Sequence, residues 1–99
     1  MESKPLRLHP AAEQEYLAAL AWYRDQSPIA AEEFAVVIRQ AIERIREAPQ
    51  RWPSYFGDFR KYTLRQFPFA IVYREWLLEV TVFAVAHGRR KPGYWKARQ

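Results

Sequence analysis

The 99-residue sequence contains no cysteine, which excludes disulfides, thiolate chemistry and a cysteine-based zinc site. No apolar run approaches the roughly 20 residues that a membrane-spanning helix needs. The first residues, Met1 to Pro5, lack the apolar core of a signal peptide. We therefore expect a soluble, cytoplasmic protein that has no membrane partner.

Acidic residues are absent from the last part of the chain. Residues 87–99 contain five basic side chains and no acid, so they account for the whole net charge of +5. This stretch also contains Tyr94 and Trp95, and it directly follows the apolar run Val80–Ala86. A buried strand is therefore expected to hold a basic, aromatic segment in a fixed place, where it suits a negatively charged partner.

The chain has enough apolar residues for one core. Its length indicates a single domain over residues 1–99, and 49% of its residues are hydrophobic. Aromatic residues reach 16%, and such side chains dominate the energetics of cores and interfaces. We expect one layer of helices on one sheet, with part of the stability supplied by a protein partner.

Hydrophobic periodicity in the first half predicts a short strand and a helical hairpin. Residues 6–9 alternate as a strand does, and a helix is predicted from Ala11 to about Gln26. Ser27 is the predicted N-cap of a second helix, which should end at Ala48 because Pro49 follows. The apolar stripe of the first helix is predicted at Tyr16, Leu17, Leu20, Ala21 and Tyr23 or Arg24, with Glu13, Glu15 and Asp25 largely outside it.

The second half of the chain predicts strands. After a loop over residues 49–57 the period changes to two, which indicates strands at 60–64, 69–74 and 78–87. A short hairpin connection is predicted at 75–77. The resulting order is β-α-α-β-β-β, an α+β fold in which a helical hairpin packs on one face of a small, mainly antiparallel sheet.

Four segments of the chain together form a recognisable pattern. They are Trp22-Tyr23, Ser27-Pro28 with Ala30-Ala31 and Phe34, Phe67–Tyr73, and Val85–Arg90 followed by Pro92 and Tyr94-Trp95. In this order they resemble the RelE/ParE superfamily of toxins from type II toxin–antitoxin systems, over residues 6 to 98. The resemblance implies a partner antitoxin that wraps the toxin in a hetero-oligomer.

The superfamily contains two activities. RelE-like members cut messenger RNA on the ribosome, whereas ParE-like members act on DNA gyrase and are not nucleases. In RelE-like toxins the strand matching Phe69–Tyr73 usually carries an arginine about three residues before the tyrosine. Here Ala70 holds that position, and an alanine cannot stabilise charge on a cleaved phosphate. The resemblance therefore favours a ParE-like gyrase toxin, with a RelE-like endoribonuclease and a non-toxic, basic nucleic-acid-binding module as alternatives.

Several residues near the end of the last strand are candidates for chemistry. His87, Arg89, Arg90 and Tyr94 offer the base, acid and cations that a metal-independent nuclease needs. The simpler interpretation is that His87 ends a strand by hydrogen bonding and that the arginines form a solvated rim. Tyr94 and Trp95 offer surfaces for base stacking, but we expect them to anchor the segment to the fold.

Candidate target-binding residues form two basic groups. Arg89 and Arg90 should matter most because they follow the strand directly, whereas ordering Lys96 and Arg98 costs more entropy and yields less per contact. For the group of Arg60, Lys61 and Arg65, the alternative is that they form an ordinary exposed rim of the sheet. The two groups are Arg60, Lys61 and Arg65, and Arg89, Arg90 and Lys91.

Two remaining candidates concern the antitoxin and metals. Trp22 and Tyr23 are predicted to pack in the core or to contact the antitoxin, rather than to form a catalytic site. His9 has no histidine or acidic neighbour at ligand spacing, so we expect no metal site and no cofactor.

Overall fold

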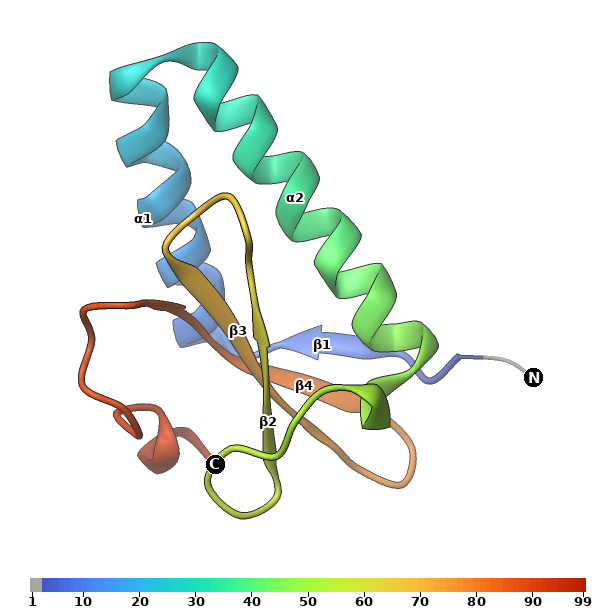
Figure 1. Cartoon of the computed structure of the whole chain (residues 1–99). Helices are drawn as coiled ribbons and strands as arrows, with labels where there is room; N and C mark the ends of the chain where they lie inside the picture. Colours follow the sequence, from blue (N-terminus) through green and yellow to red (C-terminus); the bar gives the residue numbers. More distant parts are fainter. Residues whose placement is uncertain (1–2) are drawn as a thin grey trace.

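The computed structural model describes residues 3–99. Two helices cover one face of a four-stranded sheet with the strand order β1-β4-β3-β2 (Figure 1). The elements are β1 (Leu6–Leu8), α1 (Pro10–Gln26), α2 (Pro28–Glu47), β2 (Phe59–Thr63), β3 (Phe69–Glu75) and β4 (Val80–His87), with one-turn 3-10 helices at Pro49–Arg51 and Lys96–Arg98. The predicted order and the α+β class are confirmed. Within residues 3–99 no helix has both the length and the apolarity of a membrane span.

Side-chain caps define the starts of both helices. The Ala11 N–H donates to His9 Nδ1 at 3.0 Å, so His9 is an N-cap. The Ala30 N–H donates to Ser27 Oγ at 3.4 Å, and Pro28 occupies the first turn of α2. The predicted cap at Ser27 is confirmed. The tight turn between the helices places them side by side as a hairpin across the sheet (Figure 1).

The predicted apolar stripe of α1 was partly wrong. Ala12 and Ala19 are the buried residues of this helix, whereas Leu17 and Ala21 are exposed. Tyr16, Leu20 and Tyr23 are half-buried as part of the core. Two overlapping stripes satisfy helical spacing in this alanine-rich helix, and the one with small residues faces inward because α1 lies close to β4.

All four strands differ from the prediction at one or both boundaries, and β1 ends at Leu8 rather than at residue 9. β2 is Phe59–Thr63 rather than 60–64, β3 extends to Glu75, and β4 begins at Val80. Leu78, predicted as part of a strand, instead lies in the hairpin connection and is 77% exposed. Trp76 N–H donates to the Glu79 carbonyl at 2.7 Å and closes this connection, which therefore spans Trp76 to Glu79.

The sheet is mixed, with β1 parallel to β4 and the other pairs antiparallel. Its β3–β4 register skips one residue, because Val72 pairs with Ala84 and Tyr73 pairs with Val82. Phe83 is thus the extra residue of a β-bulge. The bulge reverses which backbone groups of β4 point outward, and this reversal shapes the site described below.

Both faces of the sheet are covered. On the helix face, Phe34, Ile45 and Ile71 belong to the main core and are themselves fully shielded from solvent. On the opposite face, residues 88–99, which we call the C-terminal segment, place Trp95 against Phe59 and the neighbouring strands. Trp95 is only 2% exposed, so the prediction that this aromatic residue anchors the segment is confirmed.

Candidate functional site

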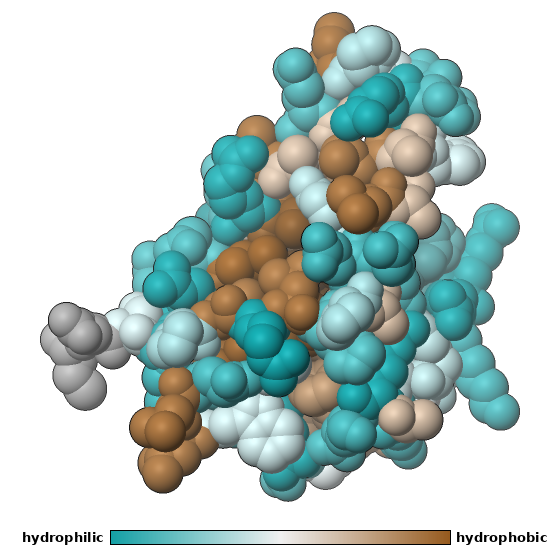
Figure 2. Space-filling model, turned by 180° about the vertical axis from the view of Figure 1, so that it is seen from behind, coloured by the Kyte–Doolittle hydropathy of each residue, from teal (hydrophilic) through white to brown (hydrophobic). Residues whose placement is uncertain are grey.

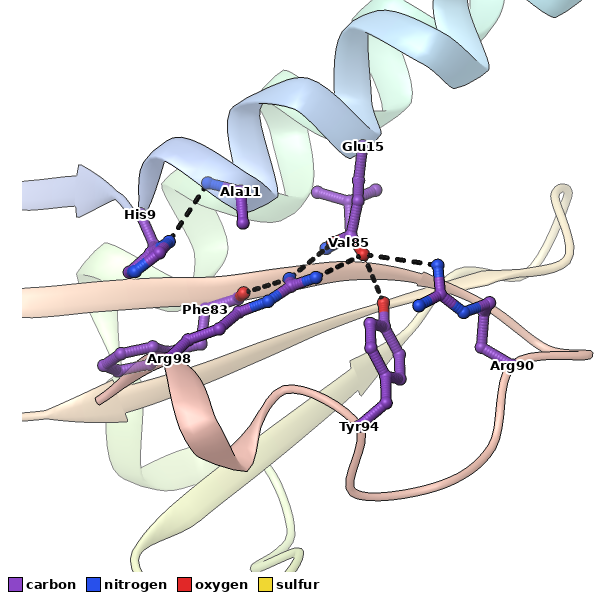
Figure 3. A network of polar contacts seen from close by, with 8 residues as sticks. All are labelled: His9, Ala11, Glu15, Phe83, Val85, Arg90, Tyr94 and Arg98. Atoms are coloured by element: carbon purple, nitrogen blue, oxygen red, sulfur yellow. Dashed lines mark hydrogen bonds and ion pairs between the residues drawn. The ribbon is translucent and has the colours of Figure 1, made fainter.

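Glu15 of α1 is the point at which the C-terminal segment is fastened to the domain. Arg98 forms a two-pronged pair with its carboxylate, with Nη1–Oε1 at 2.9 Å and Nη2–Oε2 at 3.0 Å. The Tyr94 hydroxyl donates to Oε2 at 2.6 Å, and an Arg90 nitrogen lies 3.8 Å from the same oxygen. Figure 3 shows these three side chains converging on Glu15 from the segment.

The ion pair of Glu15 and Arg98 also covers the open edge of β4. Beyond Val82, β1 has ended, and the bulge directs the Phe83 carbonyl and the Val85 N–H outward. Arg98 donates to that carbonyl at 2.8 Å, and Val85 donates to Glu15 at 3.0 Å (Figure 3). Unpaired edge groups are costly when buried, so Glu15 and Arg98 act together as a substitute for a missing strand.

This environment determines the protonation of Tyr94. Burial raises the pKa of the Tyr94 phenol, and its hydrogen bond to Glu15 raises that pKa further. The hydrogen bond with Glu15 also raises the pKa of Arg98. Tyr94 therefore remains a neutral hydrogen-bond donor at physiological pH, and its hydroxyl is already engaged with α1.

A cavity of about 530 Å³ lies on the sheet face opposite the helices. The C-terminal segment covers part of that face through Trp95. Lys61 of β2 lies 4.4 Å from the centre of the Tyr55 ring, and the Arg90 guanidinium lies 3.9 Å from the centre of the Tyr94 ring. These two cation–aromatic pairs belong to the cavity wall.

The structure brings together only some of the predicted target-binding residues. Lys61, Arg65 and Arg90 line the cavity. Arg60 points to the other side of β2, where it donates to the Trp52 carbonyl at 2.7 Å, because successive strand residues alternate between faces. Arg89 and Lys91 are exposed in the turn after β4 and are not part of the cavity lining.

The nuclease candidates do not form a free acid–base pair. His87 lines the cavity, but its Nδ1 accepts the Arg89 N–H at 3.0 Å, and Phe69 packs edge-on against its ring. Tyr94 is bound to Glu15. The interpretation of His87 as a residue that ends a strand by hydrogen bonding agrees with this geometry.

Trp22 and Tyr23 occupy different environments. Tyr23 packs against Phe34 and Phe67 in an aromatic cluster, with ring centroids 5.0 Å away in each case. Trp22 is 59% exposed and stacks edge-on with Tyr23. Both residues line a shallow, mostly apolar hollow of about 320 Å³ between α1 and the end of β4.

Sequence reasoning missed the two residues that organise this site. Glu15 was expected to lie largely outside the packed face of α1, and Arg98 was expected to gain little from ordering. Instead they form an ion pair in which both side chains are less than one fifth exposed. The pairing was hidden because the two residues are far apart in the chain. The only signal was that the C-terminal segment has no acid of its own, so its cations need a partner elsewhere.

The fold and the cavity define a small α+β protein with a helical hairpin on one face of its sheet and a basic hollow on the other. A model of the family described as "ParE toxin of type II toxin-antitoxin system, parDE" matches residues 6–92. The chain therefore belongs to the ParE toxin family of type II toxin–antitoxin systems.

Individual relatives agree with this assignment. Toxin ParE2 of Mycobacterium tuberculosis, in strains CDC 1551 / Oshkosh and ATCC 25618 / H37Rv, is 28% identical over 91 residues, which are 91% of this chain and 87% of that protein. A solved structure of the chromosomal ParDE TA system from P. aeruginosa superposes with a TM-score of 0.75 at 18% identity, covering 86% of this chain and 96% of that one. The latter similarity shows a common fold.

Proposed function

We propose that this chain is a toxin that poisons DNA gyrase when free and is held inactive by a cognate antitoxin. Its membership of the ParE family supports the proposal, because action on gyrase is what the resemblance to the ParE branch implies. The basic surface around the cavity and the turn after β4 is the proposed target-binding region. It comprises Lys61, Arg65, Arg89, Arg90 and Lys91, while Arg60 lies on the opposite face of β2.

The observation that supports a gyrase toxin over a ribonuclease is the identity of the residue at the floor of the cavity. Ala70 lies there and is 7% exposed, at the position where a RelE-like nuclease usually has its phosphate-binding arginine. Tyr94 has a raised pKa and donates to Glu15, so it is not available as a base near neutral pH. Losing one preorganised group that stabilises developing charge costs about 100- to 1,000-fold in rate. We infer that the chain is not an efficient ribonuclease.

An antitoxin partner is supported by the amount of exposed apolar surface. Figure 2 shows a band of apolar surface across the rear face, bordered by hydrophilic side chains. Contiguous apolar surface of this kind marks protein interfaces. We propose that an antitoxin covers it and contacts Trp22 and Tyr23. The exposed large apolar residues are Leu17, Trp22, Ile29, Val36, Phe56, Trp76, Leu77 and Leu78.

The test is to express the chain alone in bacteria and to follow two responses in parallel. We expect growth arrest with induction of the DNA damage response, and no transcript cuts by primer extension. The paired substitution Arg89→Ala with Arg90→Ala should relieve the arrest, while a matched change of a distant exposed cation, Arg39→Ala, should not. Codon-linked cuts that disappear in His87→Ala would instead establish the ribonuclease alternative.

A further inference from the structure

The cavity opposite the helices is lined by several positively charged side chains. Lys61, Arg65 and Arg90 line it together with His87, and none of its lining residues is acidic. Within residues 3–99, Lys61 and Arg65 form no ion pair, whereas Arg90 is partly neutralised by Glu15. Lys61 and Arg65 are therefore free to bind an anion at the mouth of the cavity.

The floor of the cavity is built from small residues. Ala70 and Ala86 are direct cross-strand partners on β3 and β4, and both are more than nine-tenths buried. Val72 and Trp95 continue this floor toward the covered end of the sheet. Two paired alanines leave a depression where larger side chains would fill the space. Ala70, which stands where a RelE-like nuclease usually has an arginine, is thus also one of the residues that create the hollow.

Aromatic rings stand around this depression. Tyr55 and Tyr94 each carry a cation over one face and stand in the cavity wall. The rings of Phe67 and Phe69 instead pack against Phe34 on the helix side of the sheet. A volume of about 530 Å³ falls in the range of small-ligand pockets, roughly 300–1,000 Å³. Apolar floor, aromatic walls and a cationic mouth are the combination that binds unstacked bases and the phosphates beside them.

We propose that this cavity binds one unpaired nucleotide of a nucleic-acid strand, with the base on the Ala70–Ala86 floor and the flanking phosphates at Lys61 and Arg65. A base inside a duplex cannot enter, because its faces and edges are occupied by its neighbours. The inference rests on the proposed function and extends it. The toxin would contact the DNA strand opened by gyrase, and not only the surface of the enzyme.

Binding of labelled 12-residue oligomers to the purified full chain, followed by fluorescence anisotropy, tests the proposal. The probes are oligo-dT, oligo-rU, the duplex of the first with its complement, and an acidic peptide of similar charge. We expect the single strands to bind at least tenfold tighter than the duplex and the peptide at equal salt. The dT and rU arms distinguish DNA from RNA as the source of the nucleotide.

Substitutions distinguish the contribution of the cavity floor to binding from that of the cationic side chains. Ala70→Leu should weaken single-strand binding at least tenfold, and Thr63→Leu provides a second way to fill the cavity, from an exposed position next to Ala70. Lys61→Ala with Arg65→Ala should weaken binding and lower the slope of log affinity against log salt by about 1.4. Arg39→Ala, an exposed cation of α2, should change neither quantity.

Equal binding of single strands and duplex, unaffected by both cavity-filling changes, would overturn the proposal. So would tighter binding of the acidic peptide, which would identify the cavity as a protein-docking site. Parallel gyrase assays test the proposed function separately from nucleotide binding by the cavity. Gyrase inhibition without nucleotide binding removes only this inference, whereas nucleotide binding without gyrase inhibition removes the proposed function.

Discussion

At the scale of single residues, the carboxylate of Glu15 connects three parts of the structure at once. It accepts hydrogen bonds from a backbone amide, a phenol and a guanidinium that belong to β4 and the C-terminal segment. The side chains of Glu15 and Arg98 are 15% and 17% exposed, so solvent screens their attraction only partly. Removing the acid leaves buried donors and a cation without a partner.

We therefore predict that Glu15→Ala destabilises the chain strongly. A cost of about 3 kcal/mol is expected from breaking a buried charge pair, which corresponds to roughly 12–24 °C in melting temperature for a domain of this size. Glu13→Ala, an exposed acid on the same helix, is the matched control and should stay within about 0.5 kcal/mol. Thermal unfolding followed by circular dichroism measures both, and equal melting temperatures would contradict the assigned role of Glu15.

Titration of Tyr94 gives a second prediction at this scale. Burial and Glu15 raise its pKa above the ordinary value of 10.0, so the folded state holds the phenolic proton more tightly than the unfolded state does. The resulting stability is fully present below pH 10 and is lost as the pH rises toward the folded-state pKa. Burial raises the pKa of Tyr73 in the same direction.

Urea unfolding at pH 8 and pH 11 should therefore show a lower midpoint at the higher pH. Tyr94→Phe should reduce this difference, because it removes one of the phenols whose pKa is raised, while Tyr73 and Tyr23 keep the remainder. A parent midpoint that stays constant between the two values, or a loss of stability confined to acidic pH, would show that the phenols are not protected in the folded state.

At the scale of elements, the C-terminal segment belongs to the core rather than to a loose tail. Trp95 packs between Tyr55, Phe59 and the strands on the face that the helices leave uncovered. The short 3-10 helix that follows places Arg98 beside Glu15. Anchoring and charge pairing therefore hold the basic turn at residues 88–91 in place.

Substitutions of two tryptophans distinguish anchoring of the C-terminal segment from binding of a partner. Trp95→Ala should cost about 3–5 kcal/mol of folding stability, because the side chain is 2% exposed. Trp22→Ala should cost less than about 1 kcal/mol in the isolated chain, since 59% of that side chain is exposed, yet it should weaken antitoxin binding. Melting curves and titration calorimetry with the antitoxin measure the two effects. The reverse ranking of stabilities would mean that the segment does not seal the sheet.

Prediction from the sequence succeeded where the pattern is local. The N-cap at Ser27, the stop at Pro49 and the alternating strands each depend on neighbouring residues, so the element order could be predicted. The burial of α1 could not, because Leu17 and Ala19 fit helical stripes equally well and only the sheet decides between them. The Glu15–Arg98 pair is further out of reach, since it joins residues separated by most of the chain and depends on a β-bulge at Phe83.

At the scale of the whole molecule, the net charge of +5 is distributed unevenly. Glu15 compensates part of the charge of the C-terminal segment, while Lys61, Arg65, Arg89 and Lys91 remain on the cavity side or beside it. The helix-covered side carries the apolar band (Figure 2), and the exposed Trp22 lies beside the end of β4. This arrangement suits two different partners, an anionic target on one side and an apolar antitoxin surface on the other.

The most direct measurement uses purified chain, DNA gyrase, ATP and relaxed plasmid DNA. We predict that the chain inhibits supercoiling and causes linear, gyrase-cleaved DNA to accumulate. The paired change Arg89→Ala with Arg90→Ala should abolish both effects, while its melting temperature and antitoxin binding remain close to those of the parent. Unaffected gyrase, together with cleavage of ribosome-bound messenger RNA by the same preparation, would contradict the account.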